Sequence, residues 1–124
     1  MTDQEQLHLA LAEYYAKQKG WEIFIDQNSY FTAIKYKVPP GYQGETTYVP
    51  AHKLTDLNWL FEIEDMLIEA GIINFGRYEI DSVNNWHYAL ENTNTCKSCS
   101  AIAPRRYLAW AQALCIGIKH LEKK

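Results

Sequence analysis

The segment from Thr55 to Gly71 constrains the fold more than any other part of the chain, because it has the features of a complete helix. Thr55 or Asp56 is suited to accept hydrogen bonds from the amides of a first turn, and Gly71 is suited to the left-handed backbone that ends a helix. The apolar residues between them recur at nearly helical spacing and are Leu57, Leu60, Phe61, Met66, Leu67, Ile68 and Ala70. We therefore predict a helix that is buried along one side.

The opposite side of this helix is acidic. It carries Asn58, Glu62, Asp65 and Glu69, which are spaced so that they line one exposed stripe. Carboxylates on successive turns suit a hard cation or a basic partner, although such spacing is more commonly just a solvated face. Because magnesium-type sites recruit ligands from more than one element, we predict no metal here. Glu62, Asp65 and Glu69 are candidates for binding a partner.

Two further helices are predicted near the ends of the chain. Thr2 or Asp3 caps a first helix that runs to about Lys19 and is stopped by Gly20. The last helix begins with Pro104, whose missing amide is tolerated in a first turn. Its apolar seam, with residues three or four positions apart, consists of Tyr107, Trp110, Ala111, Leu114, Ile118 and Leu121.

Four strands are predicted between these helices, in two pairs. Alternating aromatic and branched residues mark residues 21–26 and 30–36 as one β-hairpin. Residues 73–82 and 86–91 form a second pair around the Asn84-Asn85 turn. The inward-facing side chains that we expect in this second pair are Tyr78, Ile80, Trp86, Tyr88 and Leu90.

The order of these elements indicates an α+β protein. The polar residues between Glu91 and Ala103 either extend the strand meander or loop to the last helix, so four or five strands are expected. A chain of 124 residues buries roughly two thirds of its unfolded surface, which is enough for one core. We predict a single α+β domain over residues 1–124, in which three helices cover one mainly antiparallel four- to five-stranded sheet in the order αββαββα.

Residues 37–53 form the principal loop, because the run Pro39-Pro40-Gly41 excludes a regular helix or a central strand. Residues 46–49 are still suited to a short edge strand. Tyr42 and Tyr48 would then be presented on a stiff scaffold, which limits the entropy lost when a partner binds. The alternative is that both rings pack back onto the sheet. Both tyrosines are candidates for binding a partner.

The loop and the helix that follows it form a distinctive unit. Pro50 lies near the end of the loop, the helix begins Asp56-Leu57-Asn58, and an acidic turn follows at Glu62. In this unit the chain resembles a group of short phage and prophage proteins, often described as the phage ABA sandwich domain.

Further parts of the chain follow the order of elements in that group. They are an opening helix closed by Gly20-Trp21, a strand around Trp86 and a closing alanine-rich helix over residues 104–121. The chain departs from the family pattern at Trp59 and Phe61, where smaller or more polar residues are usual. Members are generally uncharacterised, so the resemblance implies an origin and an architecture and carries over no catalytic residues.

Charge and composition exclude several classes of protein. Twelve Lys and Arg against fifteen Asp and Glu give a net charge of −3, which is too small to attract DNA through the field alone. The opening sequence MTDQEQLHLA is polar and acidic, whereas a secretory signal is basic and then apolar. No run approaches the ~18 apolar residues of a membrane span. We expect a cytoplasmic protein of the bacterial host cell, without membrane association.

Cys96 and Cys99 have the CxxC spacing of zinc knuckles and dithiols. Tetrahedral zinc requires four ligands, and the nearest further candidates in the sequence are His87 and Cys115. A redox pair of the thioredoxin type lies at the start of a helix, whereas these cysteines precede Pro104 by several residues. Plain thiols are the commoner use of cysteine in cytosolic proteins.

No catalytic set is evident in the sequence. His8, His52, His87 and His120 have no ligand spacing such as HxH or HExxH. There is no Gly-flanked nucleophile and no glycine-rich phosphate loop. We therefore predict no catalytic residues, no cofactor and no metal site.

Arg105 and Arg106 open the last helix, with Lys97 nearby in the sequence. Cations in a first turn oppose the helix dipole, at a cost of about a few tenths of a kcal/mol. This placement fits contact with phosphate or an acidic partner, and it equally fits side chains that reach away to solvent. Arg105 and Arg106 are candidates for binding a partner.

These features favour a phage or prophage accessory protein that binds a host or phage protein and is not an enzyme. The sharpest form of this hypothesis is an inhibitor of a bacterial defence system. One alternative is a nucleic-acid-associated protein that uses Arg105, Arg106, Lys97 and exposed tyrosines. Another is a zinc or thiol protein centred on Cys96 and Cys99. The apolar character of the last helix, including Ile116, also leaves room for a homodimer.

Overall fold

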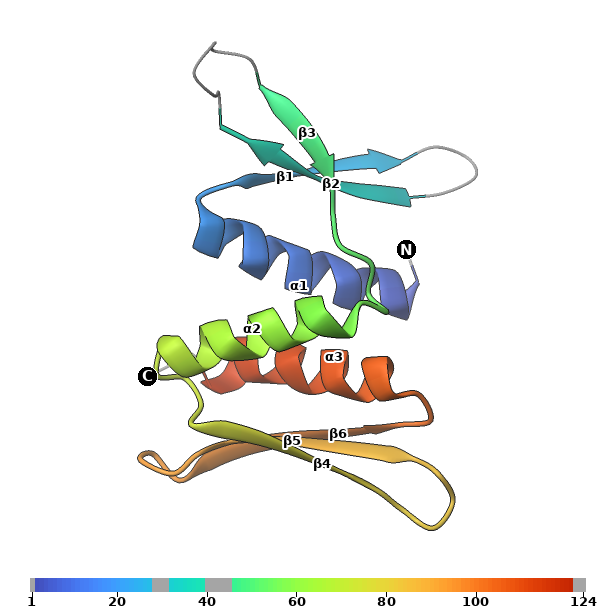
Figure 1. Ribbon diagram of the computed structural model, residues 1–124, viewed down its shortest axis with the longest axis vertical. Helices are drawn as coiled ribbons and strands as arrows, with labels where there is room; N and C mark the ends of the chain where they lie inside the picture. Colours follow the sequence, from blue (N-terminus) through green and yellow to red (C-terminus); the bar gives the residue numbers. More distant parts are fainter. Residues whose placement is uncertain (1, 28–31, 40–45, 122–124) are drawn as a thin grey trace. The chain divides into compact units, whose positions relative to one another are not determined.

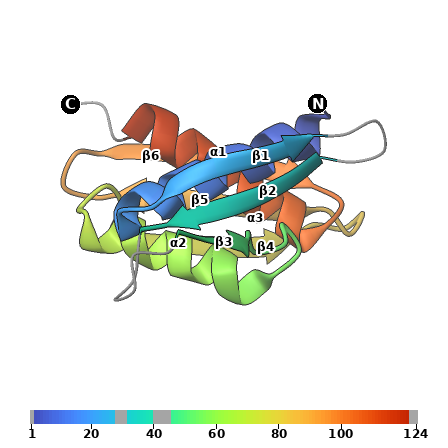
Figure 2. The same cartoon turned by 90° about the horizontal axis from the view of Figure 1, so that it is seen from above.

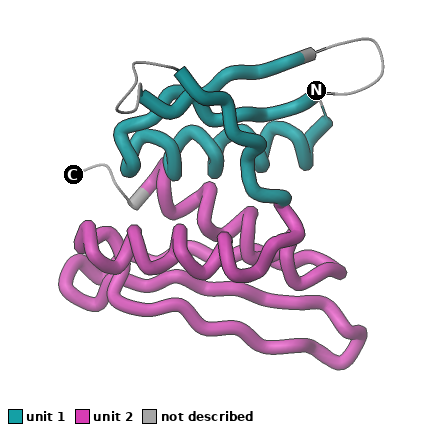
Figure 3. Tube along the Cα trace, turned by 45° about the horizontal axis from the view of Figure 1, so that its top comes forward, with its two compact units in different colours: residues 1–53 teal, residues 54–124 magenta. Residues whose placement is uncertain are grey.

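The computed structural model describes residues 2–27, 32–39 and 46–121. It divides into two compact units, residues 1–53 and 54–124 (Figure 3). Each unit contains a three-stranded antiparallel sheet and at least one helix, which confirms the predicted α+β class. That the whole chain forms a single domain stays a prediction.

The predicted order αββαββα is wrong in detail, because the described elements follow the order αβββαβββα and end with a π-helical segment. Two strands make the difference. Strand β3 (Thr47–Pro50) is the short edge strand to which residues 46–49 were suited, and strand β6 (Lys97–Ala103) shows that the polar stretch before the last helix is a strand and not a loop. Each pairs with the hairpin before it, so the strands form two three-stranded sheets instead of one sheet of four or five.

The first unit consists of helix α1 (Asp3–Lys19) and strands β1 (Glu22–Gln27), β2 (Thr32–Val38) and β3, with β2 in the centre of the sheet (Figure 1). The ends of α1 are those predicted. The Thr2 hydroxyl accepts a hydrogen bond from the Glu5 amide at 3.1 Å. Gly20 has φ of 76°, the left-handed conformation that glycine adopts at low cost.

Helix α1 lies on one face of this first sheet, against β1 and β2 (Figure 2). Aromatic rings pack between the helix and the sheet. The ring centroid of Tyr36 on β2 lies 5.6 Å from that of Tyr15 on α1 and 5.5 Å from that of Trp21. The imidazole of His52 follows β3 and lies 5.2 Å from the Tyr15 ring. Because side chains alternate along a strand, the neighbours of these core residues project from the opposite, uncovered face.

The second unit contains helix α2 (Leu57–Glu69), strands β4 (Phe75–Ile80), β5 (Trp86–Asn92) and β6, and helix α3 (Arg106–Ile116), which continues as η1 (Gly117–Leu121). Both α-helices lie on the same face of this second sheet, in which β5 is central (Figure 1). Asp56, the second of the two predicted caps, accepts hydrogen bonds from the amides of Asn58 and Trp59 at 3.0 and 3.3 Å. Gly71, at φ 75°, follows the end of α2 as predicted.

The buried side of α2 is narrower than the sequence predicted. Leu60, Ile63 and Leu67 are buried, whereas Phe61 and Ile68 are exposed. Successive residues are about 100° apart around a helix, so Phe61 is turned well away from Leu60. The prediction that Phe61, Ile68 and Ala70 belong to the buried surface is therefore wrong, because all three are exposed.

The second sheet is also covered unevenly. Tyr88 and Leu90 on β5 are buried, as predicted, and the Tyr88 ring stacks on Trp110 of α3 at 5.3 Å. Tyr78 and Ile80 face the same side, because they pair with Tyr88 and Trp86, but both are exposed. Helix α3 packs against β5 and β6, which leaves the inner face of β4 at the margin of the covered area.

Candidate functional site

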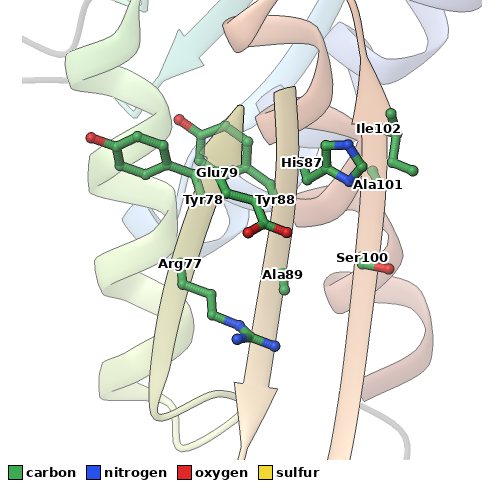
Figure 4. A pocket seen from close by; sticks show the side chains of 9 residues that line it. All are labelled: Arg77, Tyr78, Glu79, His87, Tyr88, Ala89, Ser100, Ala101 and Ile102. Atoms are coloured by element: carbon green, nitrogen blue, oxygen red, sulfur yellow. The ribbon is translucent and has the colours of Figure 1, made fainter. Parts of the chain in front are cut away.

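A hollow of about 230 Å³ lies on the outer face of the second sheet, opposite α2 and α3 (Figure 4). Its centre is formed by two small side chains on adjacent strands, Ala89 and Ser100, which are register partners. Longer side chains rise around them: Arg77 and Glu79 from β4, His87 from β5 and Ile102 from β6. The hollow is thus a shallow depression in the outer face of the sheet, surrounded mostly by polar side chains.

Most of its charged groups are engaged with neighbouring residues. Arg77 Nη2 lies 3.0 Å from Glu91 Oε1, and His87 Nε2 lies 2.8 Å from Asp81 Oδ2. Asp81 also accepts a hydrogen bond from the Asn85 amide at 2.9 Å. The hydrogen bond to His87, and then that to Asn85, lowers the pKa of Asp81. These contacts organise the turn between β4 and β5.

Asp81, His87 and Ser100 are the residue types of a Ser-His-Asp triad, in which the imidazole bonds the carboxylate and the serine through its two nitrogens. The register separates them here. His87 pairs with Ile102 and Ser100 pairs with Ala89, so Ser100 is diagonal to His87 at roughly 7–8 Å. We therefore interpret the His87–Asp81 pair as a structural contact.

A second cluster lies at the start of α3, where four aromatic side chains surround Arg106. We call Arg106 and these four residues, Tyr78, Trp86, Tyr88 and Trp110, the aromatic shelf. Arg106 Nε donates a hydrogen bond to the Tyr88 hydroxyl at 2.8 Å. The guanidinium carbon lies 5.1, 5.4 and 5.7 Å from the ring centroids of Tyr78, Trp86 and Trp110. Because Tyr78 is 56% exposed, the shelf is open to solvent beside β4.

The shelf continues inward to a half-buried carboxylate that the sequence did not single out. Trp110 Nε1 donates a hydrogen bond to Glu64 Oε1 on α2 at 3.2 Å. Burial raises the pKa of Glu64, against the lowering effect of that hydrogen bond. The carboxylate lies against Gly76 of β4, where a Cβ atom would collide with it. Glycine at this position leaves room for the acid.

A third feature lies on the outer face of the first sheet and is called here the Tyr48 face. The rings of Phe24 on β1 and Tyr48 on β3 meet edge to face, with centroids 5.3 Å apart. They are 44% and 50% exposed, so Tyr48 packs on the sheet and is also open to solvent. Two ion pairs flank the rings, Lys37 with Glu22 at 3.5 Å and Lys35 with Asp26 at 3.6 Å.

The other residues predicted to bind a partner are spread over the chain. Tyr42 lies outside the described residues. Glu62, Asp65 and Glu69 are exposed on α2, as expected for a solvated stripe. Arg105 is the exposed N-cap residue of α3 and makes no side-chain capping bond. Lys97 begins β6 and Arg105 follows its end, so the length of the strand, roughly 20 Å, separates them.

The three cysteines have different surroundings. Cys96 is exposed in left-handed backbone at φ 58°, whereas the Cys99 thiol donates to the Ala113 carbonyl of α3 at 3.5 Å. Burial raises the pKa of Cys99 and raises that of Cys115 to about 12. Across residues 2–27, 32–39 and 46–121, no three His, Cys, Asp or Glu side chains are grouped as metal ligands.

Two histidines that are far apart in the sequence meet in the first unit. His8 Nε2 donates a hydrogen bond to the backbone carbonyl of His52 at 2.6 Å. His52 Nδ1 lies 3.2 Å from the Tyr36 hydroxyl. Their separation by 44 positions explains why spacing rules did not detect the contact. The two histidines connect α1 to the chain that follows β3.

Comparisons with models of protein families, with curated proteins and with solved structures find no match. In the part of the chain that the structure describes, none of the helices has both the length and the apolar character required to cross a bilayer.

Proposed function

We propose that this protein is a non-enzymatic binding module whose partner is a host or phage protein. The observation that carries the proposal is the Tyr48 face, where two half-exposed rings are held on an antiparallel sheet. Aromatic side chains fixed by a sheet lose little conformational entropy on binding. Tyrosine and phenylalanine are also enriched at the centres of protein interfaces.

The charges around the rings favour a protein partner over a nucleic acid. Lys35 and Lys37 are each paired with a carboxylate on β1, so the face presents equal numbers of acidic and basic groups. Binding to a phosphate backbone depends on Lys and Arg that replace counterions. Paired charges beside exposed rings instead resemble the polar rim of a protein interface.

The resemblance of the loop and helix around Asp56 to the phage ABA sandwich domain supports a phage or prophage origin. An accessory protein of that origin acts inside the bacterial host, and occlusion of a host protein requires only a binding surface. Inhibition of a bacterial defence system is the sharpest form of this proposal.

A nucleic-acid partner is the second candidate, because Arg106 and the exposed Tyr78 combine a cation with a stacking platform. A fluorescence polarisation titration with single-stranded DNA at low salt tests it, and a flat curve excludes it. A zinc or thiol function of Cys96 and Cys99 is tested by elemental analysis and by thermal melting with chelator and reductant.

The leading proposal is tested by affinity capture from a lysate of the host bacterium. The intact chain is expected to retain one protein in stoichiometric amount. The Tyr48→Ser variant, which removes a half-exposed ring, should retain much less of it while keeping the circular dichroism spectrum of the parent protein. If the intact chain retains no stoichiometric protein, the proposal fails.

A further inference from the structure

Arg106 has two terminal amino groups that the described part of the chain does not use. Its hydrogen bond to Tyr88 engages Nε, and its remaining described contacts are the three ring faces of the shelf. Within those residues, no carboxylate forms an ion pair with Arg106. Arg77 in the same unit contrasts with it, because Arg77 is paired with Glu91 at 3.0 Å.

The surroundings of Arg106 hold its guanidinium in place. Tyr88 fixes Nε through a hydrogen bond of 2.8 Å, and the rings of Tyr78, Trp86 and Trp110 lie within 5.7 Å of the guanidinium carbon. Ring faces attract a cation but accept no strong hydrogen bond from its terminal amino groups. A planar guanidinium held in this way is well placed to bind both oxygens of a carboxylate, because the Arg106 side chain loses little further conformational entropy on binding.

We propose that the aromatic shelf binds an Asp or Glu carboxylate of a protein partner, next to an apolar side chain of that partner. The terminal amino groups of Arg106 donate to the two carboxylate oxygens. The apolar neighbour packs on Tyr78 and Ile80, which are exposed on the inner face of β4. Tyr, Trp and Arg, the residue types of the shelf, are those that most often dominate binding energy at protein interfaces.

The local charge favours a single carboxylate over a nucleic acid. Trp110 of the shelf is hydrogen-bonded to Glu64, so one carboxylate already lies beside the shelf. A phosphate chain would bring several negative charges close to that carboxylate. An acidic residue flanked by apolar residues brings only one negative charge, and that charge pairs with Arg106.

This inference rests on the proposed function only in taking the carboxylate from a protein, because the shelf is a different surface from the Tyr48 face. NMR of the intact chain tests it with three probes: acetyl-Leu-Asp-Leu-amide, acetyl-Leu-Asn-Leu-amide and tetrathymidylate. The signals to follow are the Nε–H of Arg106, which its hydrogen bond protects from exchange, and the indole N–H of Trp86. The aspartyl peptide should shift both signals with a saturable curve. The asparaginyl peptide should bind about tenfold more weakly, because it lacks the charge for an ionic hydrogen bond.

Two arginine variants form a matched pair. Arg106→Lys keeps the charge but removes the planar guanidinium, and it should weaken binding of the aspartyl peptide by about tenfold. Arg77→Lys makes the same change on the outer face of the sheet and should leave binding unchanged. Tyr78→Ala removes an exposed ring and should weaken binding of both peptides. Circular dichroism checks that each variant is folded, and if Arg106→Lys unfolds, the comparison of the two peptides on the parent protein decides.

The proposal is overturned if neither signal shifts at several millimolar peptide or if the two peptides bind equally. It is also overturned if tetrathymidylate binds more tightly than the aspartyl peptide, or if Arg77→Lys weakens binding as much as Arg106→Lys. None of these results bears on the Tyr48 face. Conversely, if affinity capture through the Tyr48 face fails, the NMR result for the aspartyl peptide on the aromatic shelf remains valid.

Discussion

Glu64 is a half-buried carboxylate whose surroundings raise its pKa. Burial raises its pKa above the ordinary value of 4.5, so the folded protein holds this proton at a pH where the unfolded chain has lost it. The free energy of unfolding therefore decreases as the pH rises from about 4.5 through the raised pKa. Glu64→Gln keeps an oxygen that accepts from Trp110 and removes the buried charge. We expect the variant to have a higher Tm than the parent near neutral pH.

Thermal melting followed by circular dichroism, near pH 4.5 and near neutral pH, checks this prediction. The gain from Glu64→Gln should be large at the higher pH and small at the lower one. Glu69→Gln, at an exposed site on the same helix, should show no such difference. A Glu64→Gln protein that melts below the parent near neutral pH would contradict the account.

The cysteines provide a second prediction at this scale. Alkylation requires the thiolate, and Cys115 is buried with its pKa raised to about 12, so it should react only when the chain unfolds. The exposed Cys96 should react first, and Cys99 should be slower because burial raises its pKa. Iodoacetamide labelling at mildly alkaline pH, followed by peptide mass spectrometry, measures the order. Protection of Cys96 and Cys99 together would instead indicate a shared ligand.

Local features were predicted well from the sequence, whereas contacts between distant residues were not. The cap at Thr2 and the left-handed Gly20 and Gly71 depend on a few neighbouring residues, which spacing rules describe. Arg106 was predicted as a cation at a helix start and as a candidate for binding a partner, but its aromatic surroundings were not predicted. Its contacts come from rings on β4, β5 and α3, and no local pattern indicates that these will meet.

At the scale of elements, all three helices and both hairpins were predicted, because their periodicity differs from that of the surrounding chain. The grouping of strands was not. Alternation of residues shows that a strand has two faces, but it does not identify the neighbour with which the strand pairs. Short β3 and polar β6 carry weak strand signals. They pair with β2 and β5, and the described strands form two separate sheets where one was expected.

The start of α2 permits a direct test, since Thr55 and Asp56 were equal candidates for its cap. In the structure the Asp56 carboxylate accepts two amide hydrogen bonds. Asp56→Ala should lower the free energy of unfolding by about 1 kcal/mol, the usual effect of removing a helix cap. Thr55→Ala should change it by much less. Urea unfolding of both variants makes the comparison, and a larger loss from Thr55→Ala would contradict the assignment.

At the scale of the whole molecule, the two units share one design. Each has a three-stranded antiparallel sheet whose described α-helices lie on one face only, α1 in the first unit and α2 with α3 in the second. Antiparallel sheets commonly have one face exposed to solvent, so the side chains on that face are available for binding. In the first unit the open face presents Phe24 and Tyr48, and in the second it presents the hollow around Ala89 and Ser100.

The central claim is that the Tyr48 face binds a protein, and its most direct test is the Kd of the captured partner for two matched variants. Phe24→Ser alters the Tyr48 face, whereas Phe75→Ser removes a ring of similar exposure, 41% against 44%, from the second sheet. Titration calorimetry should show affinity at least about tenfold weaker for Phe24→Ser, as expected for a contact at the centre of an interface, and unchanged for Phe75→Ser. Equal affinities for Phe24→Ser and the parent protein would contradict the account.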